Sequence, residues 1–205
     1  MIEAARPTAP VMILDEFLAA EEWRQLLDFT FSRAEHFQPT QVISNDGGDR
    51  LDHDTRRSVV MFEPEWVREL FAERLMTFFP QILTGLGHPW FEVTRIETQL
   101  TGTGDGEFFR AHTDNGSEAV AGRTITFVYC FYREPRPFSG GELRIHDTIF
   151  DNGGIRDAGA FRDVAPLQNQ VILFPSGYLH EVIPVNCPGA TFFDRRFTVN
   201  GWLHR

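Results

Sequence analysis

The sequence contains no lysine, and all 19 of its basic residues are arginine. Chemistry that needs an ammonium side chain is therefore excluded, including Schiff-base catalysis, pyridoxal phosphate anchoring and a phosphate-loop lysine. Against 29 Asp and Glu residues, the formal net charge is −10. Phosphate binding needs a basic stripe, and the arginines here are scattered along the chain. The composition therefore argues against a nucleic-acid partner.

Long hydrophobic runs and cysteines are also missing or scarce. No apolar run approaches the ~20 residues that a membrane-spanning helix needs, and residues 1–10 lack the apolar core of a signal peptide. Cys130 and Cys187 do not form a CxxC pair, so the sequence predicts neither a disulfide framework nor a zinc knuckle. We therefore expect a soluble cytoplasmic protein with no membrane partner.

The residues that are present predict one folded domain over residues 1–205. Of the 205 residues, 42% are hydrophobic and 20 are phenylalanine, which is enough to build a sizeable core. Apolar spacing predicts a helix over residues 18–31 and a second helix that begins at Glu63-Pro64-Glu65 and stops at Gly85 and Gly87. Between them, residues 38–57 are polar and lack any period, which is typical of a long loop, either a lid or a disordered segment.

The remainder of the chain is predicted to form strands. Short β-rich runs separated by Gly-rich turns occupy residues 91–101, 107–113, 123–132, 142–147, 170–174, 179–185 and 196–202. This pattern favours a mainly β sandwich or barrel over a wound parallel sheet. We expect a helical part over about residues 11–87 and a β core over about residues 91–204.

One pair of residues has the spacing of metal ligands. His112 and Asp114 are two apart on an extended segment, so both side chains project to the same face. A His-x-Asp pair alone occurs by chance in many proteins, so a third ligand is needed. His180, delivered by a turn to the head of a later apolar strand, can supply it, whereas His146 shares a solvated polar face with its neighbours. Two histidines and one carboxylate form the facial triad of non-haem Fe(II) oxygenases, which leaves coordination positions open.

A second candidate site lies near the C-terminus. In the run from Arg196 to Trp202, alternation places Arg196 and Thr198 on one face. A guanidinium that faces a barrel interior needs an anion, because an unpaired buried charge is very expensive. A small carboxylate ligand would satisfy it, with the Thr198 hydroxyl as a further donor. The alternatives are a protein carboxylate such as Asp194, or surface positions for both Arg195 and Arg196.

The order of these motifs resembles that of the 2-oxoglutarate and Fe(II)-dependent prolyl hydroxylases, especially the oxygen-sensing type. The resemblance covers roughly residues 55–203. It is carried by His112-x-Asp114, Gly140-Gly141-Glu142-Leu143-Arg144-Ile145, His180-Glu181-Val182-x-Pro184-Val185, Arg196-x-Thr198 and Trp202, together with Arg56-Arg57-Ser58 and Arg123-Thr124-Ile125-Thr126.

This resemblance implies a fold, a set of cofactors and a role for each site residue. It implies a double-stranded β-helix of the jelly-roll or cupin type, with N-terminal helices packed on it and residues 38–57 over the mouth of the site. Iron would be bound by His112, Asp114 and His180, and 2-oxoglutarate by Arg196 and Thr198. O2 would be the second cosubstrate, with ascorbate as a stimulant.

The sequence departs from the family pattern in two places. The interval from His180 to Arg196 is longer than usual, which leaves Arg195 as a possible anchor, although alternation favours Arg196. Cys130 stands where relatives often have a tyrosine that reaches the cosubstrate. Thr198, or a polar residue on the strand over residues 91–101, can replace that hydroxyl.

The predicted activity is hydroxylation of a C–H bond in a prolyl or related amino-acid residue, with succinate and CO2 as coproducts. A peptide or protein substrate is favoured over a free amino acid, and Arg123, Arg56 and Arg57 are candidates to contact a substrate carboxylate or carbonyl. Each of these arginines can equally be a solvated surface charge. The alternatives are a metal-dependent cupin enzyme that does not use 2-oxoglutarate and a non-catalytic jelly-roll binding module. Among the three, the hydroxylase alone predicts O2-dependent formation of succinate from 2-oxoglutarate.

Overall fold

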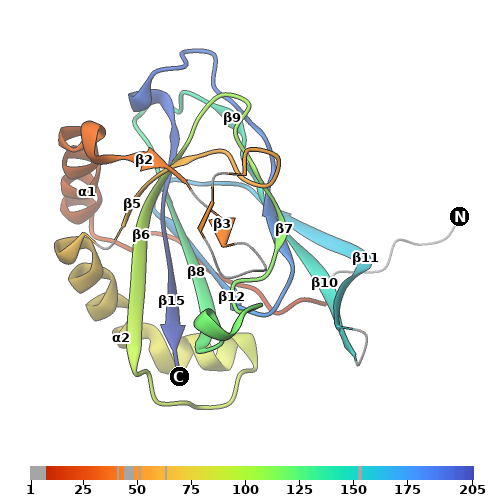
Figure 1. Ribbon diagram of the computed structural model, residues 1–205. Helices are drawn as coiled ribbons and strands as arrows, with labels where there is room; N and C mark the ends of the chain where they lie inside the picture. The colour runs from red at the N-terminus through yellow and green to blue at the C-terminus, as the bar shows by residue number, and fades with distance from the viewer. Residues whose placement is uncertain (1–7, 41, 44–48, 51, 63, 152–153) are drawn as a thin grey trace, which may run out of the picture.

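Two helices precede most of the β structure in the computed structural model (Figure 1). The structure describes residues 8–40, 42–43, 49–50, 52–62, 64–151 and 154–205. Helix α1 (Ala20–Ser32) and helix α2 (Glu65–Leu86) confirm the two helices that the apolar spacing predicts. Helix α2 ends at Gly87, whose φ of 60° lies in the left-handed region that favours glycine. Among the described residues, no helix combines the length and apolarity needed to cross a membrane.

The larger of two facing sheets is antiparallel and has seven strands. Their order across the sheet is β1 (Met12–Leu14), β12 (Gln170–Pro175), β8 (Arg123–Phe131), β15 (Arg196–His204), β6 (Arg95–Thr103), β5 (Val59–Phe62) and β2 (Gln38–Pro39). Strand β15 comes last in the sequence but lies in the middle of the sheet, between β8 and β6. This position brings its residues next to those of two other long strands.

The smaller sheet has four strands, in the order β11 (Gly154–Val164), β10 (Leu143–Asp151), β13 (His180–Val182) and β7 (Phe109–His112). Two minor pairs complete the β structure, β9 (Ser139–Gly140) with β14 (Val185–Asn186) and β3 (Val42–Ile43) with β4 (Asp49–Arg50). The described residues also form three short 3-10 helices, η1 (Ala34–His36), η2 (Glu118–Val120) and η3 (Phe192–Asp194). The architecture confirms the predicted mainly β, jelly-roll fold with helices packed on it.

Successive side chains of β8 point to opposite faces of the larger sheet, so this strand contacts the helices on one face and the smaller sheet on the other. Phe127 and Tyr129 point to the helical side, where Phe71 of α2 packs on both rings at centroid distances of 5.8 and 5.2 Å. Val128 and Cys130, on the opposite face, belong to a second, smaller cluster between the two sheets. The helices therefore bury the outer face of the larger sheet, and its inner face is left for the site.

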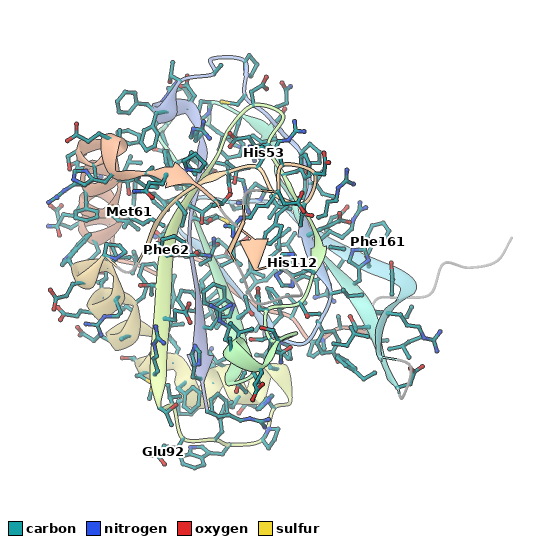
Figure 2. The ribbon with its side chains drawn as sticks, viewed as in Figure 1. His53, Met61, Phe62, Glu92, His112 and Phe161 are labelled. Carbon is teal, nitrogen blue, oxygen red and sulfur yellow. The ribbon has the colours of Figure 1, made fainter. Side chains whose placement is uncertain are left out.

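The structure contains strands that the hydrophobic pattern does not predict. Strand β11 is mostly exposed, so its residues show no apolar alternation to mark it. With β10 it forms a hairpin that projects from the body, on which Phe161 is labelled in Figure 2. Residues 38–57 include β2, β3 and β4, and part of this predicted lid, residues 41, 44–48 and 51, lies outside the described residues.

The expectation that His146 is solvated is wrong. His146 lies opposite Phe161 of β11, with 6.0 Å between the two ring centroids, and only 7% of the surface of His146 is exposed. Its ring nitrogens lie 3.0 Å from a carboxylate oxygen of Asp157 and 3.2 Å from one of Glu181. The next residue, Asp147, is buried as well, and it links the N-terminal segment to the smaller sheet.

The Asp147 carboxylate accepts hydrogen bonds from the backbone N–H of Thr8 at 2.7 Å, from the Thr8 hydroxyl at 3.0 Å and from the backbone N–H of Ala9 at 2.8 Å. A few residues later, β1 pairs with β12 of the larger sheet. The start of the described chain therefore fastens the two sheets to each other.

Candidate functional site

The two candidate histidine ligands lie on adjacent strands of the smaller sheet. His112 is the last residue of β7 and His180 is the first residue of β13, and the antiparallel register of these strands places them directly opposite each other. Their ring centroids are 4.2 Å apart. Figure 2 shows His112 near the centre of the molecule. Asp114 follows two residues after His112, as the sequence predicts for side chains on one face.

Backbone carbonyls fix the orientation of both imidazole rings. Nδ1 of His112 lies 2.8 Å from the carbonyl oxygen of Arg110, and Nδ1 of His180 lies 3.0 Å from that of Tyr178. A proton on each Nδ1 that is donated to the carbonyl leaves the Nε2 lone pair free for a metal ion. Both Nε2 atoms face Asp114, at 3.5 and 3.3 Å from its carboxylate oxygens. The donor set therefore fits one divalent metal ion.

The Asp114 carboxylate is also held from the opposite sheet. The Thr126 hydroxyl on β8 donates to Asp114 Oδ2 at 2.7 Å, and the Ser176 hydroxyl lies 3.0 Å from that of Thr126. The backbone N–H of Asp114 donates to the Ser176 carbonyl at 3.0 Å. Thr126 and Ser176 are almost completely buried. Sequence reasoning missed both residues, although the alternation along β8 places Thr126 on the inner face.

The electrostatics of the three residues follow from burial and mutual contact. Burial by itself raises the pKa of Asp114, but the two neighbouring histidines hold that pKa well below its usual range. Burial, followed by repulsion from His180, lowers the pKa of His112. Burial also lowers the pKa of His180, but the Asp114 carboxylate outweighs it, so the net shift is upward. Metal binding requires the carboxylate and neutral imidazoles, so a metal ion at this site would displace the proton that Asp114 favours on His180.

The three residues line a cavity of about 1270 Å³ between the two sheets, together with Arg196 and Thr198 at the start of β15. The Arg196 side chain is only 2% exposed, and it makes no ion pair with a carboxylate within the described part of the chain. Its Nε has no hydrogen-bond partner, and its Nη2 lies 3.9 Å from the sulfur of Cys130. Burial lowers the pKa of this guanidinium. An orphaned buried cation in a cavity needs an anionic ligand.

The backbone over Arg196 is shaped to cover it. A side chain at Gly141 would put a Cβ 2.7 Å from Arg196 Cδ, and the φ of Gly141 is +71°, so the position favours glycine on both counts. The neighbouring Arg195 points elsewhere and pairs with Glu107 at 2.6 Å. The other protein carboxylate that the sequence suggested, Asp194, is paired with Arg133. Neither sequence alternative for the partner of Arg196 is present in the structure.

A ladder of polar side chains runs along the cavity wall from Arg196 toward the mouth. The cross-strand pairs between β15 and β6 are Arg196 with Thr103, Thr198 with Thr101, Asn200 with Gln99 and Trp202 with Glu97, and all eight residues line the cavity. Thr198 is also opposite Cys130 on β8. The Thr198 hydroxyl is thus on the strand next to Cys130, and Thr101 and Thr103 are one strand further away, on β6.

The predicted substrate contact Arg123 lies at the mouth of this cavity. Its Nη2 is 2.5 Å from a Glu97 carboxylate oxygen, and its guanidinium stacks on Trp202 at 3.5 Å from the ring centroid. His204 shares the same carboxylate at 3.1 Å. Glu97 and His204 were not identified from the sequence, because their neighbours in space come from strands far apart in the chain.

A jelly-roll core that brings two histidines, one carboxylate and an unpaired buried arginine into one cavity defines a class of protein, the non-haem iron oxygenases that use an oxoacid. Residues 98–204 match the family model of the 2OG-Fe(II) oxygenase superfamily. The chain therefore belongs to this superfamily of dioxygenase enzymes, whose members use Fe(II), 2-oxoglutarate and O2.

Individual relatives agree with this assignment. The chain is 37% identical over 194 residues to an uncharacterized PKHD-type hydroxylase of Synechocystis, covering 94% of this chain and 62% of that protein. Its fold is similar to that of a Pseudomonas putida prolyl-4-hydroxylase, with a TM-score of 0.68, 21% identity and coverage of 97% of this chain and 94% of the other. It is also similar to a Trichoplax adhaerens prolyl hydroxylase, solved with a hypoxia inducible factor peptide fragment, with a TM-score of 0.67, 16% identity and coverage of 96% and 84%. This chain thus spans less than two thirds of the length of its Synechocystis relative.

Proposed function

We propose that this protein is a 2-oxoglutarate-dependent hydroxylase that acts on a C–H bond of a prolyl or related amino-acid residue. In the overall reaction, one oxygen atom of O2 enters the product hydroxyl, and 2-oxoglutarate becomes succinate and CO2. The observation that carries the proposal is the unpaired, buried Arg196 in the same cavity as His112, Asp114 and His180. A metal site alone does not need this cation, whereas a dicarboxylate cosubstrate does.

Some residues of the site would bind the metal ion, and others orient those ligands. His112, Asp114 and His180 would bind Fe(II) through two imidazole nitrogens and one carboxylate oxygen. When bound, the iron supplies the activation of O2 that the side chains themselves cannot provide. The backbone carbonyls behind the rings and the Thr126 hydroxyl behind Asp114 hold the ligands in one orientation.

The cosubstrate pocket is assigned to the inner end of the polar ladder. Arg196 would pair with the distal carboxylate of 2-oxoglutarate, and Thr198 would donate a further hydrogen bond to it. Arg195 does not compete for this role, since its guanidinium pairs with Glu107. Thr198, or a polar residue of the neighbouring strand β6 such as Thr101, would take over the contact that a tyrosine hydroxyl makes in similar enzymes.

The substrate is assigned to the outer end of the cavity, near Arg123. This guanidinium already pairs with Glu97 and stacks on Trp202, so it would contact a substrate carbonyl through its remaining N–H groups. A peptide is favoured because the cavity is large and the similar Trichoplax enzyme was solved with a peptide fragment. A cytoplasmic location stays a prediction of the sequence.

The two alternatives give no reason for Arg196. A cupin enzyme that works without 2-oxoglutarate, or a jelly-roll binding module without catalysis, has no use for a buried guanidinium that lacks a protein partner. Membership of the 2OG-Fe(II) oxygenase superfamily also favours the hydroxylase.

The test combines binding with turnover. Fe(II) and 2-oxoglutarate are first titrated under nitrogen, and formation of the coloured iron–oxoacid chelate is followed by absorbance. O2 and ascorbate are then added with proline-containing peptides, free amino acids and nucleotides, and products are analysed for one added oxygen atom and for succinate. We expect proline peptides to be hydroxylated. Binding of iron without any effect of 2-oxoglutarate would contradict the proposal.

A further inference from the structure

Three arginines gather around Phe108 and Phe109, two residues that line the cavity, and we call Arg56, Arg57 and Arg110 the arginine rim. Arg56 stacks over the ring of Phe109 at 4.5 Å, and Arg57 and Arg110 stack over Phe108 at 5.4 and 5.2 Å. Arg56, Phe108 and Phe109 line the cavity itself. The isolated bridge between Arg56 and Phe109, and backbone hydrogen bonds of Arg57 and Arg110 across the same two segments, hold the group together.

The rim is directly connected to the candidate metal site. The ring of Phe109 stacks on that of His112, with 3.6 Å between centroids and 18° between planes. Phe109 therefore contacts both the Arg56 guanidinium and a candidate iron ligand. A group bound by Arg56 is held close to the place where a substrate C–H bond must react.

The guanidinium groups of the rim donate to neutral groups, although the Asp114 carboxylate also acts electrostatically on Arg56 and offsets part of the lowering of its pKa by burial. Nε of Arg57 donates to the carbonyl of His53 at 2.7 Å, and Nε of Arg56 donates to the Ser58 hydroxyl at 3.1 Å, while Nε of Arg110 donates to a backbone carbonyl. These partners are neutral, and within the described ranges none of the three arginines forms an ion pair. Other arginines of the chain do have carboxylate partners, among them Arg74, Arg123, Arg133, Arg144, Arg156 and Arg195.

This concentration of positive charge is unexpected in a chain with a net charge of −10. Burial lowers the pKa of Arg56 to about 10, so its side chain is still charged at neutral pH. Stacking on Phe108 and Phe109 restricts the guanidinium groups before any ligand arrives, which reduces the entropy lost on binding. A local cluster of this kind attracts negatively charged groups to the cavity mouth.

We propose that the arginine rim selects an acidic segment of a peptide substrate, in which Asp or Glu residues flank the residue that is hydroxylated. This inference rests on the proposed function and names its substrate class more narrowly. Carboxylates fit the forked guanidinium groups, and the chain that carries them can enter the cavity alongside Phe109. Nucleic acid is the less favoured source of anionic groups, since the remaining surface is acidic and repels a long polyanion.

The test measures binding without turnover. The full chain is loaded with Mn(II) and 2-oxoglutarate under nitrogen, and fluorescence anisotropy reports the binding of short labelled peptides with a central proline. One peptide carries glutamates on both sides of the proline, a second carries glutamines at the same positions, and an oligothymidylate of equal charge is the third probe. We expect the glutamate peptide to bind roughly 10-fold more tightly than the glutamine peptide at low salt. The difference should shrink near 0.5 M salt.

Two variants test whether the rim causes this preference. Arg57→Gln/Arg110→Gln changes two exposed side chains only, so it keeps the test valid if the triple variant with Arg56→Gln does not fold. The matched control is Arg24→Gln/Arg33→Gln, which removes two exposed arginines that also stack on aromatic rings, one on helix α1 and one directly after it. The rim variants should lose the preference for glutamate, and the control should keep it.

Three results would overturn the inference. They are equal binding of the two peptides by the unmodified protein, a preference that survives in the rim variants, and rim-dependent binding of the oligothymidylate that exceeds that of the glutamate peptide. Succinate release separates this inference from the proposed function. Equal turnover of both peptides contradicts the acidic preference and supports the hydroxylase, whereas rim-dependent binding without succinate from any peptide supports the rim and contradicts the hydroxylase.

Discussion

Replacement of Thr126 by valine tests how the candidate metal ligand Asp114 is held. Valine has nearly the same shape as threonine but lacks the hydroxyl that donates to Asp114 Oδ2 at 2.7 Å. The change leaves the carboxylate without its donor from β8 and also removes the partner of the Ser176 hydroxyl. Because Thr126 is only 2% exposed, water cannot easily replace the lost group.

The magnitude follows from the kind of hydrogen bond that is removed. A buried hydrogen bond to a charged group contributes about 1.5–3 kcal/mol. If most of this energy is expressed in the preorganisation of Asp114, metal affinity falls by about 10- to 100-fold, which is also the usual effect of removing a partner of a metal ligand. The fold should remain intact, since the side-chain volume is conserved.

The assay is the dissociation constant for Mn(II) or Fe(II), measured by calorimetry under nitrogen. Thr126→Ser retains the hydroxyl and should bind metal nearly as tightly as the unmodified protein. Thr124→Val is the matched control on the same strand, because its hydroxyl contacts only the carbonyl of Gly122, at 3.1 Å. Metal affinity that is unchanged in Thr126→Val would refute the assigned role, as would equal losses in the Thr126→Val and Thr124→Val variants.

Three further predictions concern other parts of the structure. Arg196→Gln should weaken 2-oxoglutarate binding by about 2–5 kcal/mol in a titration, because the ligand carboxylate loses its buried partner. Arg195→Gln should change this binding little. A larger loss of binding in Arg195→Gln than in Arg196→Gln would mean that Arg195 binds the cosubstrate. His180→Ala should abolish metal binding measured by calorimetry, whereas His146→Ala should keep it; metal binding lost only in the second variant would contradict the assigned triad. Asp147→Asn should lower the free energy of unfolding in urea by about 1–3 kcal/mol, since a carboxylate that accepts several buried hydrogen bonds becomes an amide. An unchanged urea midpoint would show that this contact stabilises nothing.

Local patterns in the sequence predicted part of the site and of the fold. The spacing of His112 and Asp114 placed both on one face, and alternation separated Arg196 from Arg195, as the structure shows. The two helices were predictable because each has a long apolar stripe. These features depend only on near neighbours in the chain.

Other features depend on contacts between distant segments and were not predictable. The register that places His180 opposite His112 is set by the pairing of β13 with β7. His146 is buried among side chains of the paired strands β11 and β13, among them Phe161 and Glu181, which the polar alternation of its own strand does not reveal. The arginine rim joins Arg56 to Arg110 across two segments, and only Arg56 belongs to a motif that could be recognised in the sequence.

The central position of β15 has a consequence for how the protein is made. The ribosome produces this strand after every other strand of the larger sheet, yet β8 and β6 meet only through it. Until residues 196–204 have emerged, β1, β12 and β8 remain separate from β6, β5 and β2, and chains with such distant pairings fold slowly and are prone to aggregate. The same strand carries Arg196 as its first residue. A nascent chain interrupted before that point lacks both the middle of its sheet and the cation of its cavity.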